Sequence, residues 1–197
     1  MSVCPERQAM GAEYLVFEEL PFASPEDLRR TFRRHAAGVA VVTANGTSGP
    51  VGVTVTSLAS VSADPPRVSF NIAHTSSSWP TVSLARYVGI HLLGAEQVQL
   101  AATFARSGAD RFAAPTVWAP GPRRVPIVDG CVSWLVGAIE DRLTVGDHTI
   151  VVVKVLHVGG PADTADPLLY HDGSFRRLTR EALSAEAPRN GRRRVPR

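Results

Sequence analysis

Five hydroxyl side chains and no charged one lie in the twelve residues from Val51 to Ser62, which makes this stretch the strongest candidate for binding a ligand. The hydroxyls belong to Thr54, Thr56, Ser57, Ser60 and Ser62. Valines at 51, 53 and 55 alternate with small or polar residues, the two-residue period of a strand with one face in a core. The other face, whose groups both donate and accept hydrogen bonds, suits a flat ligand with a polar edge, such as a flavin ring. The alternative is a barrel strand whose threonines reflect only β-propensity.

A second cluster of hydroxyls consists of three consecutive serines, Ser76, Ser77 and Ser78. They stand just before a short helical segment expected near residues 81–86. Serine hydroxyls and the unpaired N–H groups of a helix N-terminus can converge on a phosphate. The alternative is a plain helix cap in a polar loop.

His148 follows a tight turn at Gly146-Asp147 and opens a strand of valines, so we expect its ring at the rim of a barrel. A neutral imidazole at such a rim can hydrogen-bond a ligand. The alternative is that His148 closes the turn by bonding a backbone carbonyl. The sequence has no paired carboxylates, nucleophile elbow or metal-ligand spacing, so no metal is expected.

The elements that must position these groups are mostly strands. The pattern predicts a helix over 25–36 with one buried face, a hairpin joining 39–44 to the strand that begins at Val51, and a second helix from Glu96 to about residue 107. Further strands are predicted at 68–73, 87–93, 131–145, 148–158 and on both sides of the turn Asp172-Gly173. The proline-rich residues 113–126 are expected to lack regular structure and to form a lid or a subunit contact. About seven strands and two or three short helices predict a mostly β, antiparallel barrel.

Length and charge indicate one domain with extensions. We expect a flexible arm over residues 1–23, a folded domain over 24–180 and a basic, disordered tail over 181–197. Residues 189–197 hold five arginines, and without them 16 basic residues face 18 acidic ones, so nucleic-acid binding is not expected. No apolar run reaches the length of a membrane span, and the N-terminal residues lack the apolar core of a signal peptide. A cytoplasmic location, with Cys4 and Cys131 as thiols, is therefore expected.

Six segments between residues 28 and 178 resemble, in order and spacing, the flavin reductase-like family with the FMN-binding split-barrel fold. This family includes the reductase components of two-component flavin monooxygenases. The segments read RRTFRRHAAGVAVVT, GVTVTSLASVSADPPRVSFNIA, HTSSSWP, FARSGADRF, GDHTIVVVKV and PLLYHDGSFRRL. The resemblance implies binding of FMN or FAD, oxidation of NADH or NADPH, and a homodimer whose flavin sites lie near the subunit interface.

The resemblance also assigns roles to single residues. The edge of the isoalloxazine would meet Thr54, Val55, Thr56 and Ser57, and the ring or ribityl chain would lie on Ser60 and Val61. The flavin phosphate would meet Ser76, Ser77 and Ser78, with Phe104 and Ala105 packed nearby, and His148 would meet the nicotinamide nucleotide. Thr56 departs from the Asn or Ala of many relatives, and the Lys or Arg that others carry close to the phosphate loop is missing.

The leading hypothesis is an NAD(P)H:flavin oxidoreductase that passes reduced flavin to a partner monooxygenase. Hydride transfer between the two cofactors needs positioning and charge stabilisation by the protein, and no acid–base pair. One alternative is a flavin-retaining oxidoreductase that acts directly on an organic substrate beneath the loop 113–126. Another is a non-catalytic binding module whose arginine tail docks on an anionic partner.

Overall fold

A computed structural model of the chain describes residues 22–160 and 166–178. The chain divides into two compact units, residues 1–32 and 33–197. Almost all of the predicted arm over 1–23 and the whole predicted tail over 181–197 lie outside the described residues. Both assignments, and the limits of the domain over 24–180, therefore stay predictions.

The first unit contains helix α1, Pro25–Phe32, whose start is fixed by a reciprocal cap. The Asp27 N–H donates to Ser24 Oγ over 3.1 Å, and the Ser24 N–H donates to the Asp27 carboxylate over 3.0 Å. The helix ends four residues earlier than predicted, and none of its residues is buried. Leu28 and Phe32 are exposed, so the predicted buried face of this helix is wrong for the single chain.

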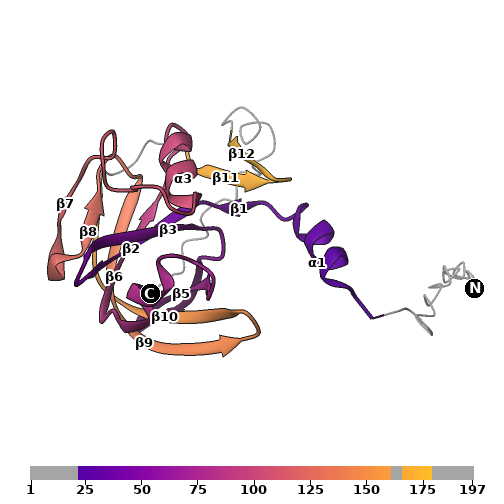
Figure 1. The fold of residues 1–197 in the computed structure, drawn as a ribbon, viewed down its shortest axis with the longest axis horizontal. Helices are drawn as coiled ribbons and strands as arrows, with labels where there is room; N and C mark the ends of the chain where they lie inside the picture. Colours follow the sequence, from indigo (N-terminus) through magenta and orange to yellow (C-terminus); the bar gives the residue numbers. More distant parts are fainter. Residues whose placement is uncertain (1–21, 161–165, 179–197) are drawn as a thin grey trace, which may run out of the picture. The chain divides into compact units, whose positions relative to one another are not determined.

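The second unit is built from strands and two further helices (Figure 1). Its elements are β1 Ala37–Gly38, β2 Ala40–Gly46, β3 Gly49–Val55, β4 Ala59–Ala63, β5 Pro66–Ala73, α2 Trp79–Leu84, β6 Tyr87–Leu92, α3 Val98–Ala105, β7 Trp118–Pro120, the 3-10 helix η1 Pro122–Arg124, β8 Pro126–Val128, β9 Ser133–Val145, β10 His148–Gly159, β11 Leu168–His171 and β12 Ser174–Arg177.

Seven strands form one antiparallel sheet in the order β3-β2-β6-β9-β10-β5-β4, which curls on itself in Figure 1. Its edge strands β3 and β4 do not pair with each other, so the barrel stays split. Two small sheets, β1-β11-β12 and β7-β8, complete the unit. The predicted mostly β, antiparallel split barrel is confirmed, with more strands in the described residues than the seven expected.

The hydroxyl-rich stretch that begins at Val51 is not one strand. The hairpin of β2 and β3 turns between Gly46 and Gly49, where Gly49 has a φ of 113° that suits glycine. Pairing with β2 ends at Val55, and a new strand, β4, begins at Ala59 and pairs with β5. Residues 56–58 therefore carry the chain from one edge of the split sheet to the other. The two-residue period was correct only for the first half of the stretch.

Two apolar clusters flank β2 and β3. The inner core, inside the curled sheet, is made mainly of aliphatic side chains and includes Val42, Val55, Phe70, Ile90 and Val151. The outer core lies under α3 and the segment 112–131, and its buried members are Val39, Val41, Leu93, Ala101, Phe104, Val128, Cys131 and Leu168. Because side chains alternate along β3, Val51, Val53 and Val55 face the inner core while Gly52 and Thr54 face α3.

His91 joins the outer core to its neighbours. Its Nδ1–H donates to the Val41 carbonyl over 3.0 Å, and its Nε2 accepts the Val128 N–H over 3.1 Å. Burial lowers the pKa of His91 to about 4, although the bond to Val41 opposes this shift. The neutral imidazole of His91, on β6, therefore links β2 and β8 through two hydrogen bonds.

Two other expectations are corrected. The proline-rich residues 113–126 contain β7, η1 and the start of β8, because the prolines sit at the ends of a short antiparallel pair and at the start of a 3-10 turn. The helix predicted from Glu96 begins at Val98, so Glu96 lies outside it. No helix in the described residues is long and apolar enough to cross a membrane.

Candidate functional site

A pocket of about 340 Å³ lies at the end of β3, where the chain crosses the split; we call it the strand-end pocket. Six of the residues predicted to bind a cofactor line it: Thr54, Val55, Thr56, Ser57, Ser76 and His148. The remaining wall is Val53 and the end of β5, residues 71–73. Residues from four separate segments therefore meet around a cavity without a charged carboxylate or ammonium group in its lining.

The hydroxyls of this pocket are not equally available to a ligand. Thr54 Oγ1 donates to the Ala101 carbonyl over 2.7 Å, and this bond fixes the side chain against α3. Ser57 Oγ accepts the Asn71 N–H over 2.8 Å, which pins the crossing segment to β5. Thr56 is exposed and has no hydrogen-bond partner within the described residues. Its hydroxyl, and the backbone of residues 56–58 beyond the ladder, are the donors left for a ligand.

His148 is held at the rim of the pocket by its neighbour. Its Nδ1 lies 2.7 Å from Asp147 Oδ1, and the side chain is about half exposed. The hydrogen bond from His148 lowers the pKa of Asp147, which is therefore a carboxylate at neutral pH. Since a carboxylate only accepts, Nδ1 carries the hydrogen and Nε2 is free for another partner. The alternative bond to a backbone carbonyl is not the one found.

The second and third residues of the serine loop, Ser77 and Ser78, meet the guanidinium of Arg111. Ser78 is fully buried, and its Oγ donates to the Gly52 carbonyl over 2.8 Å. Arg111 Nη1 lies 3.1 Å from Ser77 Oγ and 3.2 Å from Ser78 Oγ. We call Ser77, Ser78 and Arg111 the phosphate corner.

Arg111 is the site residue that sequence reasoning missed. Its Nη2 donates to the Arg106 carbonyl over 2.7 Å, while its Nε is buried without a partner in the described residues. Burial lowers the pKa of this guanidinium from its usual value, yet arginine stays charged at neutral pH. An orphaned, buried N–H on a cation fits a phosphate ligand. The only hint in the sequence was the segment FARSGADRF, which places an arginine after a helix.

The helix that follows the serines is anchored at both ends. At its start, Ser78 bonds to β3 and to Arg111, and at its end Arg142 Nη2 donates to the carbonyls of Val82 and Ala85. No side-chain cap is formed at Ser78, because its hydroxyl points to β3 instead. Tertiary contacts therefore hold the serine loop, and the alternative of a plain helix cap is not found at Ser78.

Four predicted residues belong neither to the strand-end pocket nor to the phosphate corner. Ser60 and Val61 are exposed on β4, and Ala105 is exposed at the end of α3. Phe104 is buried against Gly52, where a Cβ would come within 2.6 Å of its Cε1. Gly52 is thus small because an aromatic ring packs on it. The binding roles of these four stay predictions.

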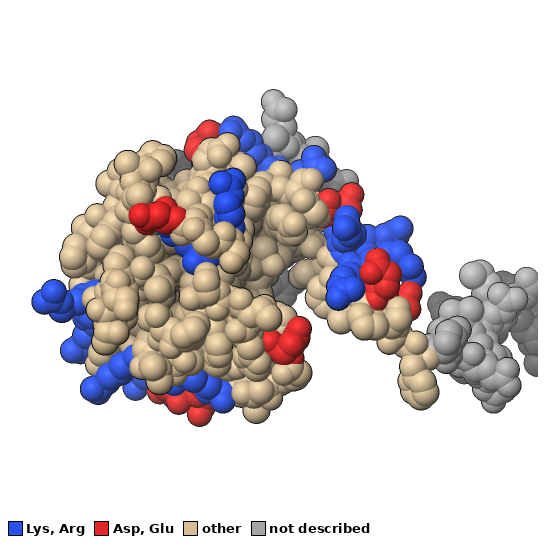
Figure 2. Space-filling view, viewed as in Figure 1, with Lys and Arg blue, Asp and Glu red and all other residues tan. Residues whose placement is uncertain are grey.

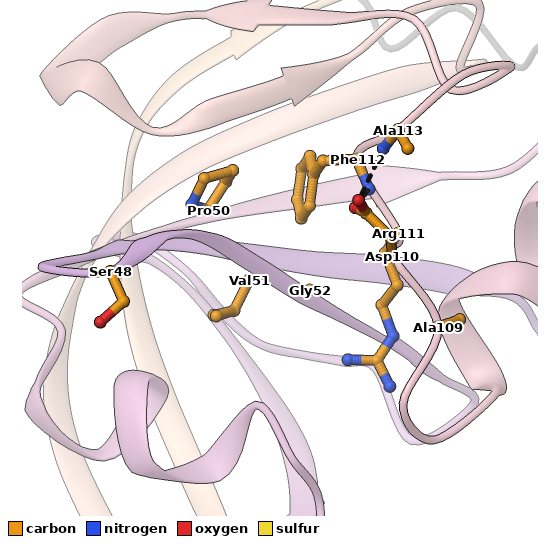
Figure 3. A pocket seen from close by; sticks show the side chains of 9 residues that line it. All are labelled: Ser48, Pro50, Val51, Gly52, Ala109, Asp110, Arg111, Phe112 and Ala113. Atoms are coloured by element: carbon orange, nitrogen blue, oxygen red, sulfur yellow. Dashed lines mark hydrogen bonds between the residues drawn. The ribbon is translucent and has the colours of Figure 1, made fainter.

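A second pocket, of about 440 Å³, lies along the first half of β3; we call it the arginine pocket (Figure 3). Its lining is Ser48, Pro50, Val51, Gly52 and residues 109–113. Asp110 Oδ1 accepts the N–H groups of Phe112 and Ala113, which shapes this loop. Arg111 belongs both to this lining and to the phosphate corner, so the corner adjoins the arginine pocket.

The surroundings of the site are largely uncharged. On the face drawn in Figure 2, most of the surface over the barrel is neither acidic nor basic, and Lys and Arg gather toward its margins. The described part of the chain has no group of three or more His, Cys, Asp or Glu side chains that could hold a metal ion. The arrangement can position planar, polar-edged ligands and one phosphate.

Comparison with known proteins identifies the family of this chain. Residues 32–179 match the family model described as flavin reductase like domain. An NADH:FMN oxidoreductase of Rhodococcus erythropolis is 47% identical over 156 residues, which are 78% of this chain and 81% of the relative. The reductase component of a 4-nitrophenol 4-monooxygenase/4-nitrocatechol 2-monooxygenase of Rhodococcus opacus is 33% identical over 151 residues, 76% of this chain and 78% of the relative.

Solved structures agree with these relatives. A flavin reductase domain protein from Arthrobacter superposes with a TM-score of 0.74 at 42% identity, covering 78% of this chain and 95% of that one. An NADH:FAD oxidoreductase from Streptomyces globisporus, in complex with NAD and FAD fragments, gives a TM-score of 0.75 at 30% identity, covering 83% and 99%. The chain therefore belongs to the flavin reductase-like domain family and is an oxidoreductase.

Proposed function

We propose that this enzyme oxidises NADH, or NADPH, and reduces FMN or FAD, which then serves a partner monooxygenase. The relatives carry part of this proposal, because they include an NADH:FMN oxidoreductase and a monooxygenase reductase component. The structural observation that carries it is the neutral strand-end pocket, whose residue Ser76 is followed in the chain by Ser77, the hydrogen-bond partner of the half-buried Arg111. A flavin has the matching parts, a flat ring with a polar edge and a phosphate.

The chain's own residues bind and orient in this proposal. Thr56 and the backbone of residues 56–58 hydrogen-bond the polar edge of the ring, and Thr54 keeps α3 against β3 beneath it. Ser77 and Arg111 hold the phosphate, so a distant segment supplies the cation that the sequence lacks close to the serine loop. His148 offers Nε2 to the nicotinamide nucleotide while Asp147 fixes its tautomer.

The bound flavin supplies the hydride acceptor, and the nicotinamide supplies the hydride. The residues named above would orient the nicotinamide and the flavin ring against each other and exclude water. This orientation would lower the barrier to hydride transfer. The pocket's neutral lining leaves the hydroxyls and backbone N–H groups to stabilise negative charge on the ring edge. No side chain needs to transfer a proton.

The deciding experiment is NADH and NADPH consumption by the purified protein with FMN, FAD and riboflavin, alongside its visible absorbance. We expect turnover with at least one nucleotide and one flavin. Absence of flavin-dependent turnover with both nucleotides would refute the reductase assignment. A yellow protein that reduces no added flavin would favour the flavin-retaining alternative.

We also propose a homodimer, as expected from the apolar content of β9 and β10. Large apolar side chains are exposed on these strands in the single chain: Leu143, Val145, Leu156 and Val158. A second copy would cover them. Sedimentation velocity at micromolar concentration tests this, and a monomer of about 21 kDa would contradict it. The cytoplasmic location stays a prediction from the sequence.

A further inference from the structure

The turn that carries His148 is also held from outside its hairpin, by His74. The His74 N–H donates to the Asp147 carbonyl over 3.0 Å, one position beyond the ladder between β5 and β10, in which His148 pairs with Ala73. The ring Nε2 of His74 lies 2.9 Å from Thr149 Oγ1. His74 therefore contacts the residue before His148 through its backbone and the residue after it through its side chain.

In the proposed function, on which this role rests, His148 offers Nε2 to the nicotinamide nucleotide. We propose that His74 is a positioning residue for the hydride donor: its ring holds Thr149, and Thr149 fixes the direction in which His148 presents Nε2. His74 is not among the residues that line the strand-end pocket. It therefore acts on the nucleotide through His148 and not by direct contact.

The bond between His74 and Thr149 is placed where it constrains the strand. Thr149 is fully buried, so its hydroxyl is shielded from water and needs a partner within the protein. His148, the next residue, is about half exposed, and its ring hydrogen-bonds only Asp147 among the described residues. Neighbouring side chains of a strand point to opposite faces, so a backbone rotation at Thr149 would also swing His148. The anchored hydroxyl limits that movement.

His74 is itself held by packing against Trp79. The centroids of the two rings are 5.3 Å apart, with an interplanar angle of 34°, and Trp79 packs against the inner core. His74 also lies near the Asp147 carboxylate. The hydrogen bond from His148 is the largest cause of the lowered pKa of Asp147, and the proximity of His74 contributes to the same shift. The inner core therefore supports His74, and His74 supports the turn.

The test uses variants that separate the hydrogen bond of the His74 ring from its packing. His74→Phe keeps an aromatic ring beside Trp79 and loses the bond, whereas His74→Gln places an amide nitrogen near the position of Nε2. Thr149→Val removes the partner hydroxyl. In steady-state kinetics, His74→Phe and Thr149→Val should each raise the KM for NADH about threefold, with kcat and the Kd for FMN nearly unchanged. His74→Gln should restore most of the wild-type KM.

The His148→Ala background distinguishes positioning from a general loss of structure. Once the His148 ring is gone, His74→Phe should raise the KM for NADH no further, so the two effects are not additive. Thr43→Val is the matched control, because Thr43 is equally buried in the same sheet and donates to the Pro126 carbonyl over 2.6 Å. Thr43 does not line the strand-end pocket. Thr43→Val should lower the Tm as Thr149→Val does and leave the KM unchanged.

Three results would count against the positioning role of His74. An unchanged KM in His74→Phe, or an equal rise with and without the His148 ring, would overturn it while the reductase activity stood. A matching rise of the KM in Thr43→Val would overturn it too, since the loss of any buried hydroxyl would then loosen the site. Absence of flavin-dependent turnover in the wild type would instead refute the proposed function, and this role with it.

Discussion

The two pockets along β3 are built in different ways. The strand-end pocket is neutral, and its hydroxyls come mostly from one short run of sequence, residues 54–57. The arginine pocket depends on a cation, Arg111, that reaches across more than thirty residues of chain to the serine loop. A site of the first kind can be located from the sequence, because its residues are neighbours in the chain. A site of the second kind appears only when the fold places the residues together.

The supports of the two pockets also differ. The strand-end pocket adjoins the inner core, which is aliphatic apart from Phe70. The arginine pocket rests on the outer core through Phe112, and that core is bound by the buried His91. We therefore expect acid to destabilise the outer core that supports the arginine pocket. The first prediction tests this difference between the two pockets.

The largest expected effect is a loss of stability in acid through His91. The pKa is about 4 in the folded chain and near 6.5 when unfolded, so between these values the unfolded chain binds the proton more tightly. The contribution of His91 to stability is complete above about pH 6.5 and is lost as the pH falls toward 4. It amounts to about 2 to 3 kcal/mol between pH 7 and 4.5. Urea unfolding at several pH values measures this.

His91→Gln, which cannot titrate, provides the control. This variant should be less stable at pH 7, because a buried hydrogen-bonding bridge is altered. Its free energy of unfolding should fall by about 2 to 3 kcal/mol less than that of wild type over the same pH interval. Parallel pH profiles for the two proteins would show that acid acts elsewhere.

The next effect concerns the charge that distinguishes the pockets. Arg111→Met removes the cation from the phosphate corner, and a hydrogen bond to a charged group contributes ~2 kcal/mol, so the Kd for FMN should rise about 30-fold. Riboflavin has no phosphate and should bind as before. Fluorescence titration of both flavins measures the difference.

Arg111→Lys sharpens this test. Lysine keeps the charge but cannot bond Ser77, Ser78 and the Arg106 carbonyl together, so it should restore only part of the FMN affinity. If the methionine variant weakens FMN and riboflavin to the same degree, Arg111 serves the loop and not the phosphate.

The same contrast explains what the sequence could and could not predict. The hairpin, the strands after it and the rim position of His148 followed from local patterns of alternation and turn residues. The end of the strand at Val55 could not be predicted from local patterns. It depends on a hydrogen bond between Ser57 and Asn71, and Asn71 lies on the distant strand β5. The strands at 118–128 were hidden by prolines, whose positions at strand ends depend on the partner strand.

Local sequence patterns also could not predict which of the candidate hydroxyls are used in hydrogen bonds within the fold. Thr54 and Ser78 were chosen as ligand-binding hydroxyls, yet each donates to a backbone carbonyl, of Ala101 and of Gly52. Their residue types suited a ligand and suited the fold equally well. Arg111 was one of many arginines, and only its long-range contacts single it out.

The smallest expected effect tests the neutral pocket through His148. His148→Ala removes the free Nε2 at the rim, and the loss of ~1.4 kcal/mol of positioning should lower kcat/KM for NAD(P)H about tenfold, mainly through KM. The fold and the Kd for FMN should be nearly unchanged, because the His148 ring hydrogen-bonds only Asp147 among the described residues. Asp147→Asn keeps the imidazole but weakens the bond that fixes its tautomer, so its loss should be smaller, about threefold. Steady-state kinetics with varied nucleotide at saturating flavin measure both. If the alanine variant melts normally and its kcat and KM for NAD(P)H match those of wild type, His148 has no role in binding the hydride donor. The two pockets would then differ only in charge.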